Sequence, residues 1–437
     1  MTYLVEAGTS IGPPPDFRDF ERQWAPLTDP ASQRTRSALL ALEAVRAGAS
    51  AEDAVRHFAE VLSGNEGELL FEQPYFFTLA TAVLADEPAH IDRLGRLLDV
   101  ERDPWDPHLS RGTMAALARG IALQTGGDLS RSSVHFEFLL QQFDERDAVS
   151  VCPIAVLCAA RLIECYVDLG RLDTATALLG TIDFCATAGL FSHIYLLYAR
   201  GRLRVAAGDT QPGLDDLLDC GRRFSKHGAL FPGFAPWRAF AARAAMTLGR
   251  TDQAVRLAED DLEAAERWGA PRLLGIAQTT MGVVREDEEA ERSLQRAVTT
   301  LKASPARLHL AGAMTELGIQ QARRGRSAKA VTTLRQAIEL STLCEAAPLA
   351  RRASDELRTT LAGSSSFRDN EHGLTPQESR IATIAAQGLT NREIAEALHL
   401  TRRTVELHLS GAYRKLGITG RTGLNAALAR SQRVDVR

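Results

Sequence analysis

The residues with the clearest chemistry lie near the C-terminus of the chain, between Thr401 and Lys415. Some are cations that can neutralise the phosphates of a nucleic acid, namely Arg402, Arg403, Arg414 and Lys415. Others can contact base edges, because a carboxylate accepts from a cytosine amino group and an aliphatic side chain touches a thymine methyl group; these are Glu406, Leu407 and Ser410. This combination predicts a surface that binds duplex DNA and reads its sequence.

An α-helix would separate this segment into two faces. The apolar face carries Val405, Leu409, Ala412 and Leu416. The opposite face carries Arg403, Leu407, Ser410 and Arg414. Such a helix packs on its own domain with one side and enters a groove with the other. The alternative is the solvated face of a structural bundle. Glu406 is consistent with that alternative because its charge repels phosphates, whereas Leu407 is not, because a solvated face favours polar residues.

Capping signals place this helix third in a set of four. Thr401 is its expected N-cap and Gly417 its expected end. The stretch Thr390–Glu393 is a capping box for the preceding helix, and Thr375–Glu378 is another, with proline at the first helical position. A fourth helix is expected over about 421–430. We include residues at these helix starts in the candidate site, namely Thr390, Asn391, Arg392, Thr401 and Thr404.

The segment from Leu374 to about Leu428 resembles the LuxR/FixJ-type helix-turn-helix domain. The resemblance rests on an L-T-x-x-E opening, a G-L-T-N-R-E-I-A centre and a T-V-E-x-H-L…K-L-G close. It implies that two such domains pair through the fourth helix, around 423–429. It also implies phosphate contacts by Lys415 and Thr404, and base contacts by Glu406, Leu407 and Ser410.

The charge of the chain is divided in a corresponding way. The 437 residues carry a formal net charge of −4, yet the stretch from His372 to Arg437 has ten Lys or Arg against five Asp or Glu. That stretch therefore carries +5 and the remainder −9. A basic terminal domain on an acidic body indicates a DNA-binding domain joined to a region that does not touch DNA.

The region before residue 363 repeats a helical pattern. Positions that end a helical run recur at spacings of 43, 38, 41, 36 and 40 residues, at Gly127, Gly170, Gly208, Gly249, Arg285 and Gly325. Five residues after each comes a small residue: Ser132, Ala175, Gly213, Ala254, Ala290 and Ala330. A turn that needs glycine, followed by a small residue where two helices approach closely, is typical of stacked helix pairs. The spacing exceeds the roughly 34 residues of a tetratricopeptide repeat (TPR), which predicts extended, degenerate TPR-like units.

The repeat region resembles the sensor segment of large ATP-binding LuxR regulators of the MalT-like class. The resemblance rests on phrases such as Glu266–Pro271 and Ser304–Leu310. Those relatives carry an ATPase module, but no G-x-x-x-x-G-K-[ST] motif occurs in this sequence. We therefore expect no nucleotide and no other cofactor.

Catalytic and metal-binding patterns are absent from the sequence. It has no G-x-S-x-G, no H-E-x-x-H and no G-x-G-x-x-G after a strand-like run, so we predict that the protein is not an enzyme. The six cysteines show no C-x-x-C spacing, so buried, reduced thiols are expected and a metal site is not. No apolar run reaches the roughly 18 residues of a membrane span, and the first residues do not form a signal peptide. We expect a soluble, cytoplasmic protein.

These patterns predict an all-α chain, a TPR-like helical-repeat array followed by a four-helix LuxR-type helix-turn-helix domain. The expected divisions are a loosely ordered arm over 1–30, the repeat region over 31–362, a linker over 363–373 and the DNA-binding domain over 374–437. The expected function is sequence-specific regulation of transcription, with the repeat region as sensor or assembly platform. The alternative is a TPR-type protein-interaction scaffold with a vestigial DNA-binding domain; intact Arg403, Thr404 and Lys415 favour the regulator.

The expected partners follow from this function. They are double-stranded promoter DNA, a second copy of the chain on that DNA, and an effector ligand or protein of unknown identity on the repeat region. RNA polymerase is a candidate partner, and no membrane is expected.

Overall fold

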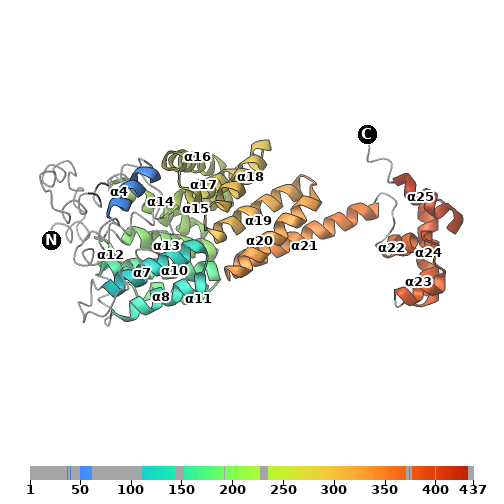
Figure 1. The fold of residues 1–437 in the computed structure, drawn as a ribbon, viewed down its shortest axis with the longest axis horizontal. Coiled ribbons are helices and arrows are strands. Elements are labelled where there is room, and N and C mark those ends of the chain that lie inside the picture. The colour runs from blue at the N-terminus through green and yellow to red at the C-terminus, as the bar shows by residue number, and fades with distance from the viewer. Residues whose placement is uncertain are drawn as a thin grey trace, which may run out of the picture. The chain divides into compact units, whose positions relative to one another are not determined.

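The computed structural model describes residues 37, 40, 50–61, 111–143, 152–190, 192–226, 235–370, 374, 376–398 and 400–431. The chain divides into two compact units, Met1–Ser354 and Asp355–Arg437. Every element in the described part is a helix, and no strand occurs there (Figure 1). The predicted all-α class is confirmed. The arm predicted over 1–30 lies outside the described residues.

Pairs of helices joined by short turns build the first unit (Figure 1). Each pair packs internally and against the next pair. The pairs are α7 (Arg111–Gly126) with α8 (Leu129–Gln141), α10 (Pro153–Leu169) with α11 (Leu172–Gly180), α13 (His193–Ala206) with α14 (Thr210–Lys226), α15 (Trp237–Thr247) with α16 (Thr251–Trp268), α17 (Pro271–Val284) with α18 (Glu288–Lys302), and α19 (Arg307–Arg323) with α20 (Ser327–Leu343). The other helices are α4 (Ala51–Val61), α12 (Phe184–Thr187) and α21 (Ala347–Asn370).

Glycine forms the turn within most of these pairs. The five predicted glycines have positive φ, a left-handed conformation in which other residues are strained; they are Gly127, Gly170, Gly208, Gly249 and Gly325. The remaining predicted position, Arg285, is extended instead, with φ −99° and ψ 149°. There Asp287 begins α18 by accepting a hydrogen bond from the Ala290 backbone N–H at 3.2 Å. The predicted spacing therefore locates the turn at Arg285 correctly. The turn itself differs, because a residue with a side chain is strained in the left-handed conformation that glycine adopts.

The small residues five positions after these turns lie where paired helices touch. Five of them have no exposed surface, namely Ser132, Ala175, Ala254, Ala290 and Ala330. The helices are also close at Gly213, where a Cβ would lie 2.8 Å from the Gly201 carbonyl oxygen and 2.6 Å from Cγ2 of Val205. The Oγ of Ser132 donates to the Gly120 carbonyl at 2.7 Å. The predicted role of these positions in close helix packing is confirmed.

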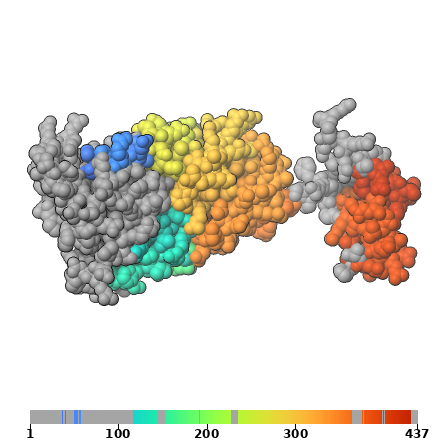
Figure 2. Space-filling model, in the orientation of Figure 1, coloured from blue at the N-terminus to red at the C-terminus, as the bar shows by residue number. Residues whose placement is uncertain are grey.

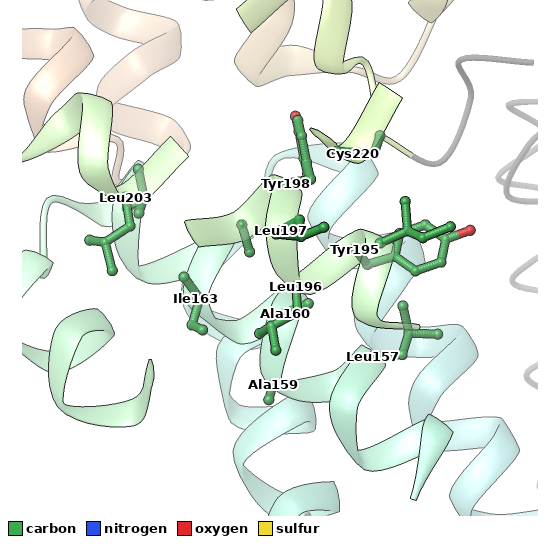
Figure 3. Close-up of a cluster of buried hydrophobic side chains, with 14 of the residues drawn as sticks. Leu157, Ala159, Ala160, Ile163, Tyr195, Leu196, Leu197, Tyr198, Leu203 and Cys220 are labelled. Atoms are coloured by element: carbon green, nitrogen blue, oxygen red, sulfur yellow. The ribbon is translucent and has the colours of Figure 1, made fainter. Parts of the chain in front are cut away.

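The main core of the array is centred on α10 and α13 (Figure 3). Nearly every residue of α10 is buried, because α8, α11 and α13 all pack around it. Ile163 of α10 and Leu196 and Tyr198 of α13 belong to one continuous apolar cluster. Each such side chain contributes about 1.5–3 kcal/mol on burial, so this cluster is a main source of the array's stability.

The cysteines are free thiols. The expected burial is confirmed for Cys158, Cys165, Cys220 and Cys344. It is wrong for Cys185, which is exposed because α12 is a single turn that buries only Thr187. No described helix is both long enough and apolar enough to cross a membrane.

The segment predicted as a linker is largely helical. α21 continues to Asn370, so residues 363–370 belong to a helix rather than to irregular chain. The boundary between the two compact units falls earlier in the chain, between Ser354 and Asp355. Extending an existing helix costs far less than starting one, and serine is only moderately unfavourable inside a helix. Gly363 and the serines after it therefore do not stop α21.

Candidate nucleic-acid interface

After the end of α21, the second unit consists of short helices around small apolar clusters. They are α22 (Pro376–Ala386), α23 (Asn391–Ala397), α24 (Arg402–Leu416), the 3-10 helix η2 (Arg421–Gly423) and α25 (Leu424–Ser431). α24 packs against α22 and α23 and buries Val405, Leu409 and Ala412. The predicted helix order is confirmed, with the fourth helix preceded by one 3-10 turn.

Local sequence signals fix both ends of α24. The Thr401 hydroxyl accepts a hydrogen bond from the Thr404 backbone N–H at 3.2 Å, and Gly417 ends the helix in the left-handed conformation. The predicted capping box at Thr390 is also present, since Thr390 and Glu393 bond each other reciprocally. The other predicted box depends on Thr375, which lies outside the described residues. The helix that carries the candidate residues is therefore set by its own sequence.

The outward face of α24 carries the predicted reading residues. Arg403, Leu407, Ser410 and Arg414 are all exposed, whereas the opposite stripe is buried. Leu407 is 67% exposed, one of few large apolar side chains that are exposed among the described residues. An apolar group in this position can contact the methyl group of a thymine when the helix lies in the major groove. The face combines two guanidinium groups, a hydroxyl and an apolar side chain.

Glu406, which would repel phosphates, has a cationic neighbour. Its Oε1 accepts a hydrogen bond from Nε of Arg402 at 3.2 Å, one helical turn away. Both side chains are largely exposed, so the pair is weak in water and can separate on contact with DNA. Arg402 therefore reduces the unfavourable charge of Glu406 on this surface.

Lys415 forms an ion pair within its own domain. Its Nζ donates to Oε2 of Glu378 at 2.7 Å, and Glu378 is 8% exposed. Gly411 leaves the room for this pair, because a Cβ there would lie 2.4 Å from Oε1 of Glu378. Lys415 thus ties α24 to α22, and its contact with a phosphate, which the resemblance implies, stays a prediction. A buried carboxylate requires a partner, and this lysine supplies it.

A residue that the sequence reasoning missed organises the start of α23. Arg421 donates through Nη1 to the Leu389 carbonyl at 2.6 Å and through Nη2 to Oδ1 of Asn391 at 3.0 Å. It thereby orients Asn391, a predicted site residue. The adjacent Arg392 is exposed and pairs with Glu396 at 3.0 Å. No local pattern could have indicated Arg421, because its partners lie 30 and 32 residues earlier.

The arrangement is that of a DNA-reading helix supported by a second helix. Helix α24 presents Arg403, Leu407, Ser410 and Arg414 on one face, and Thr390, Asn391 and Arg392 begin the packed neighbour α23. The family model for "Bacterial regulatory proteins, luxR family" matches residues 372–427. The spore germination protein GerE of Bacillus subtilis (strain 168) is 33% identical over 63 residues, which cover 14% of this chain and 85% of that protein. The chain belongs to the luxR family.

The family likeness concerns the C-terminal domain. The transcriptional activator protein BjaR1 of Bradyrhizobium diazoefficiens is 51% identical over 49 residues, which cover 11% of this chain and 20% of that protein. The chain thus spans only a fifth of the length of this luxR-family relative.

The array has its own structural likeness. The chain is similar to the solved APC/C hetero-tetramer Cut9–Hcn1, with a TM-score of 0.50 and 15% identity over 79% of this chain and 59% of that chain. At this identity the likeness shows the fold alone. The prediction of a TPR-like array followed by a luxR-type domain is confirmed.

Proposed function

We propose that this luxR-family protein is a sequence-specific, DNA-binding regulator of transcription that acts in the cytoplasm. The observation that carries the proposal is the outward face of α24, where an apolar Leu407 stands between cationic Arg403 and Arg414. Guanidinium groups neutralise phosphates, and the leucine and Ser410 contact base edges. BjaR1, a relative in this domain, is named as a transcriptional activator.

The array acts as a sensor or assembly platform in this proposal. Two copies of the chain meet on one DNA site through their C-terminal domains, because a single small domain buries too little surface to hold a long operator. The array receives an effector, and RNA polymerase is a further proposed partner. The function includes no catalytic step and no cofactor.

Binding of the full chain to duplex DNA tests the proposal. Random and promoter fragments are titrated at several salt concentrations. Affinity should fall steeply with salt, because cationic side chains displace counterions from the phosphates, and it should differ between sequences at fixed salt. Light scattering with the preferred fragment should show two chains per site. The absence of binding at low salt would exclude the proposed function, whereas binding with equal affinity to all sequences would exclude its specificity.

A further inference from the structure

The first described repeats and the end of the array touch each other. Leu129 and Leu169, which flank the turns at Gly127 and Gly170, share an apolar cluster with Cys344 and Ala346, at the junction of α20 and α21. All four side chains are buried. In Figure 2 the teal surface of the early repeats lies directly against the orange surface of the last ones. We call this contact the seam.

Polar and close steric contacts accompany the seam. Nε of Arg307 donates to the Gly126 carbonyl at 2.6 Å, and Oγ of Ser130 donates to Oε2 of Glu345 at 2.8 Å. A Cβ on Gly170 would lie 2.9 Å from Cγ of Pro348, in the first turn of α21. The partners are separated by up to 215 residues. Ordinary helical arrays are held only by contacts between neighbouring repeats, so the seam adds a connection that an open array lacks.

Backbone strain is located at the seam. Glu345 has φ 56°, the one positive φ of a non-glycine residue in the described part of the chain. A residue with a side chain adopts this conformation at an energetic cost. Glu345 follows the end of α20 in a left-handed C-cap, where its N–H donates to the Thr342 carbonyl and the Ala346 N–H donates to the Ser341 carbonyl. Its carboxylate also accepts the hydrogen bond from Ser130, so the turn between α20 and α21 is in contact with the first described helix pair.

α21 also has an attachment that does not depend on the seam. Arg352 donates to both carboxylate oxygens of Glu316 on α19, at 2.7 and 2.9 Å, and Arg243 on α15 donates to the same group at 2.5 Å. Although burial opposes ionisation, Arg243 and Arg352 hold the pKa of Glu316 below its ordinary value. This ion pair joins α21 to the neighbouring repeats. Opening the seam would therefore release the start of α21 without detaching it from α19.

We propose that the seam is a latch: it ties the first described repeats to the start of α21, the helix that continues from the array unit into the C-terminal unit. A molecule that binds the array and alters its curvature opens or tightens the seam and changes the hold on α21. The coupling between the two ends of the array is argued from these contacts and does not rest on the proposed function. Only its consequence for DNA binding depends on the proposed function.

Hydrogen exchange of the full chain tests the coupling. Leu129→Ala removes buried apolar contact from the seam, and Ser130→Ala removes only the hydrogen bond to Glu345. We expect amides of 347–354 to exchange faster, by about tenfold in Leu129→Ala and less in Ser130→Ala, because local opening sets their exchange. The matched control is Leu214→Ala, a fully buried leucine of α14 in the main core. Equal acceleration of 347–354 by Leu129→Ala and Leu214→Ala would overturn the coupling, and so would no acceleration in either seam variant.

A cross-link across the seam provides the opposite perturbation. A Cβ at Gly127 would lie 2.8 Å from Sγ of Cys344, within reach of a disulfide. The variant Gly127→Cys also carries Cys185→Ser, which removes an exposed thiol and so prevents side reactions. The oxidised form of this variant is compared with its reduced form. The oxidised protein should exchange more slowly over 347–354 and should bind DNA with an affinity at least about threefold different from the reduced protein. Unchanged exchange overturns the latch, and changed exchange with equal DNA affinities overturns its regulatory consequence. A chain that binds no DNA in either state contradicts the proposed function instead.

Discussion

On the outward face of α24, we predict that two kinds of side chain make different contacts with DNA. Arg403→Ala and Arg414→Ala should weaken binding to all sequences alike and reduce the salt dependence, by about one unit of slope each, because each removes a phosphate contact. Leu407→Ala and Ser410→Ala should instead change the preferred sequence, at about 1–3 kcal/mol per lost base contact. Selection from a random DNA pool, followed by titration of the selected sites, measures both effects. A uniform loss of affinity in all four variants would contradict this division of roles.

Lys415 should contribute to the stability of the domain more than to contact with phosphate. Lys415→Ala leaves the buried carboxylate of Glu378 without its cation and should lower the free energy of unfolding of the C-terminal unit by about 1–3 kcal/mol. The loss of stability is measured by thermal unfolding of the full chain, with hydrogen exchange of the α22 and α24 amides as the readout for the C-terminal unit. Glu378→Gln combined with Lys415→Ala should recover part of it, since a neutral amide is less costly to bury. A Lys415→Ala variant that is as stable as the unaltered chain but binds DNA more weakly would instead show that Lys415 acts mainly by contacting a phosphate.

His193 gives the array a dependence on pH. Burial lowers the pKa of His193 from 6.5 to about 4, Arg223 and Arg200 add to the effect, and Asp219 opposes it. Oγ1 of Thr187 lies 2.8 Å from its Nδ1. The unfolded chain takes up this proton near pH 6.5 and the folded chain near pH 4, so the stabilisation is present above pH 6.5 and is lost as the pH falls toward 4.

The loss is on the order of 2–3 kcal/mol, to be measured by urea unfolding at pH 7.5 and pH 4.5. His193→Asn keeps a polar group near Thr187 and removes this titration, and it should make the dependence less steep; His309, whose pKa burial lowers to about 3, contributes in the same direction and should preserve part of the dependence. An equally steep dependence in this variant would assign the effect to other groups.

Among the elements of the array, glycine serves two different structural purposes. Some glycines adopt the left-handed conformation of a turn, and others allow two helices to pack closely. Gly249 has φ 72° and open space where a Cβ would lie, so Gly249→Ala should cost only the strain of the left-handed conformation, about 1 kcal/mol. A Cβ at Gly213 would collide with Val205 and with the Gly201 backbone. Gly213→Ala should therefore force α13 and α14 apart and cost about 1–3 kcal/mol. Chemical unfolding of the two variants makes the comparison, and a larger loss at Gly249 would contradict it.

Elements set by local rules were predictable from the sequence. The 3.6-residue period separated the buried and exposed faces of α24, and the recurrence of glycines with small residues five positions later located the helix pairs. The contacts that join distant segments were not predictable. Lys415 reaches Glu378 across 37 residues, Arg421 reaches Asn391 across 30, and Arg307 reaches Gly126 across 181. Hydrophobic periodicity and capping report only neighbours within one or two turns, so they carry no information on such pairs.

For the whole molecule, the origin of the regulatory signal depends on whether the chain itself binds a nucleotide. A phosphate cradle needs several free backbone N–H groups in a glycine loop at a helix start, together with a lysine. The sequence has one pair of adjacent glycines, Gly126 and Gly127. There the side chain of Asp128 already accepts from the Arg131 backbone N–H at the start of α8, and its negative charge repels phosphate. The Gly126 carbonyl is also held by Arg307, within the seam.

We therefore predict that the purified full chain neither binds nor hydrolyses ATP or ADP. Calorimetric titration with both nucleotides and a phosphate-release assay are the measurements, and Asp128→Ala is an informative companion because it removes the repelling carboxylate. Without a nucleotide, the energy that shifts the array between states must come from the differential affinity of an effector for them. Micromolar nucleotide binding by the unaltered chain would mean that it carries a phosphate site away from its glycine pair, and the seam would then respond to that site.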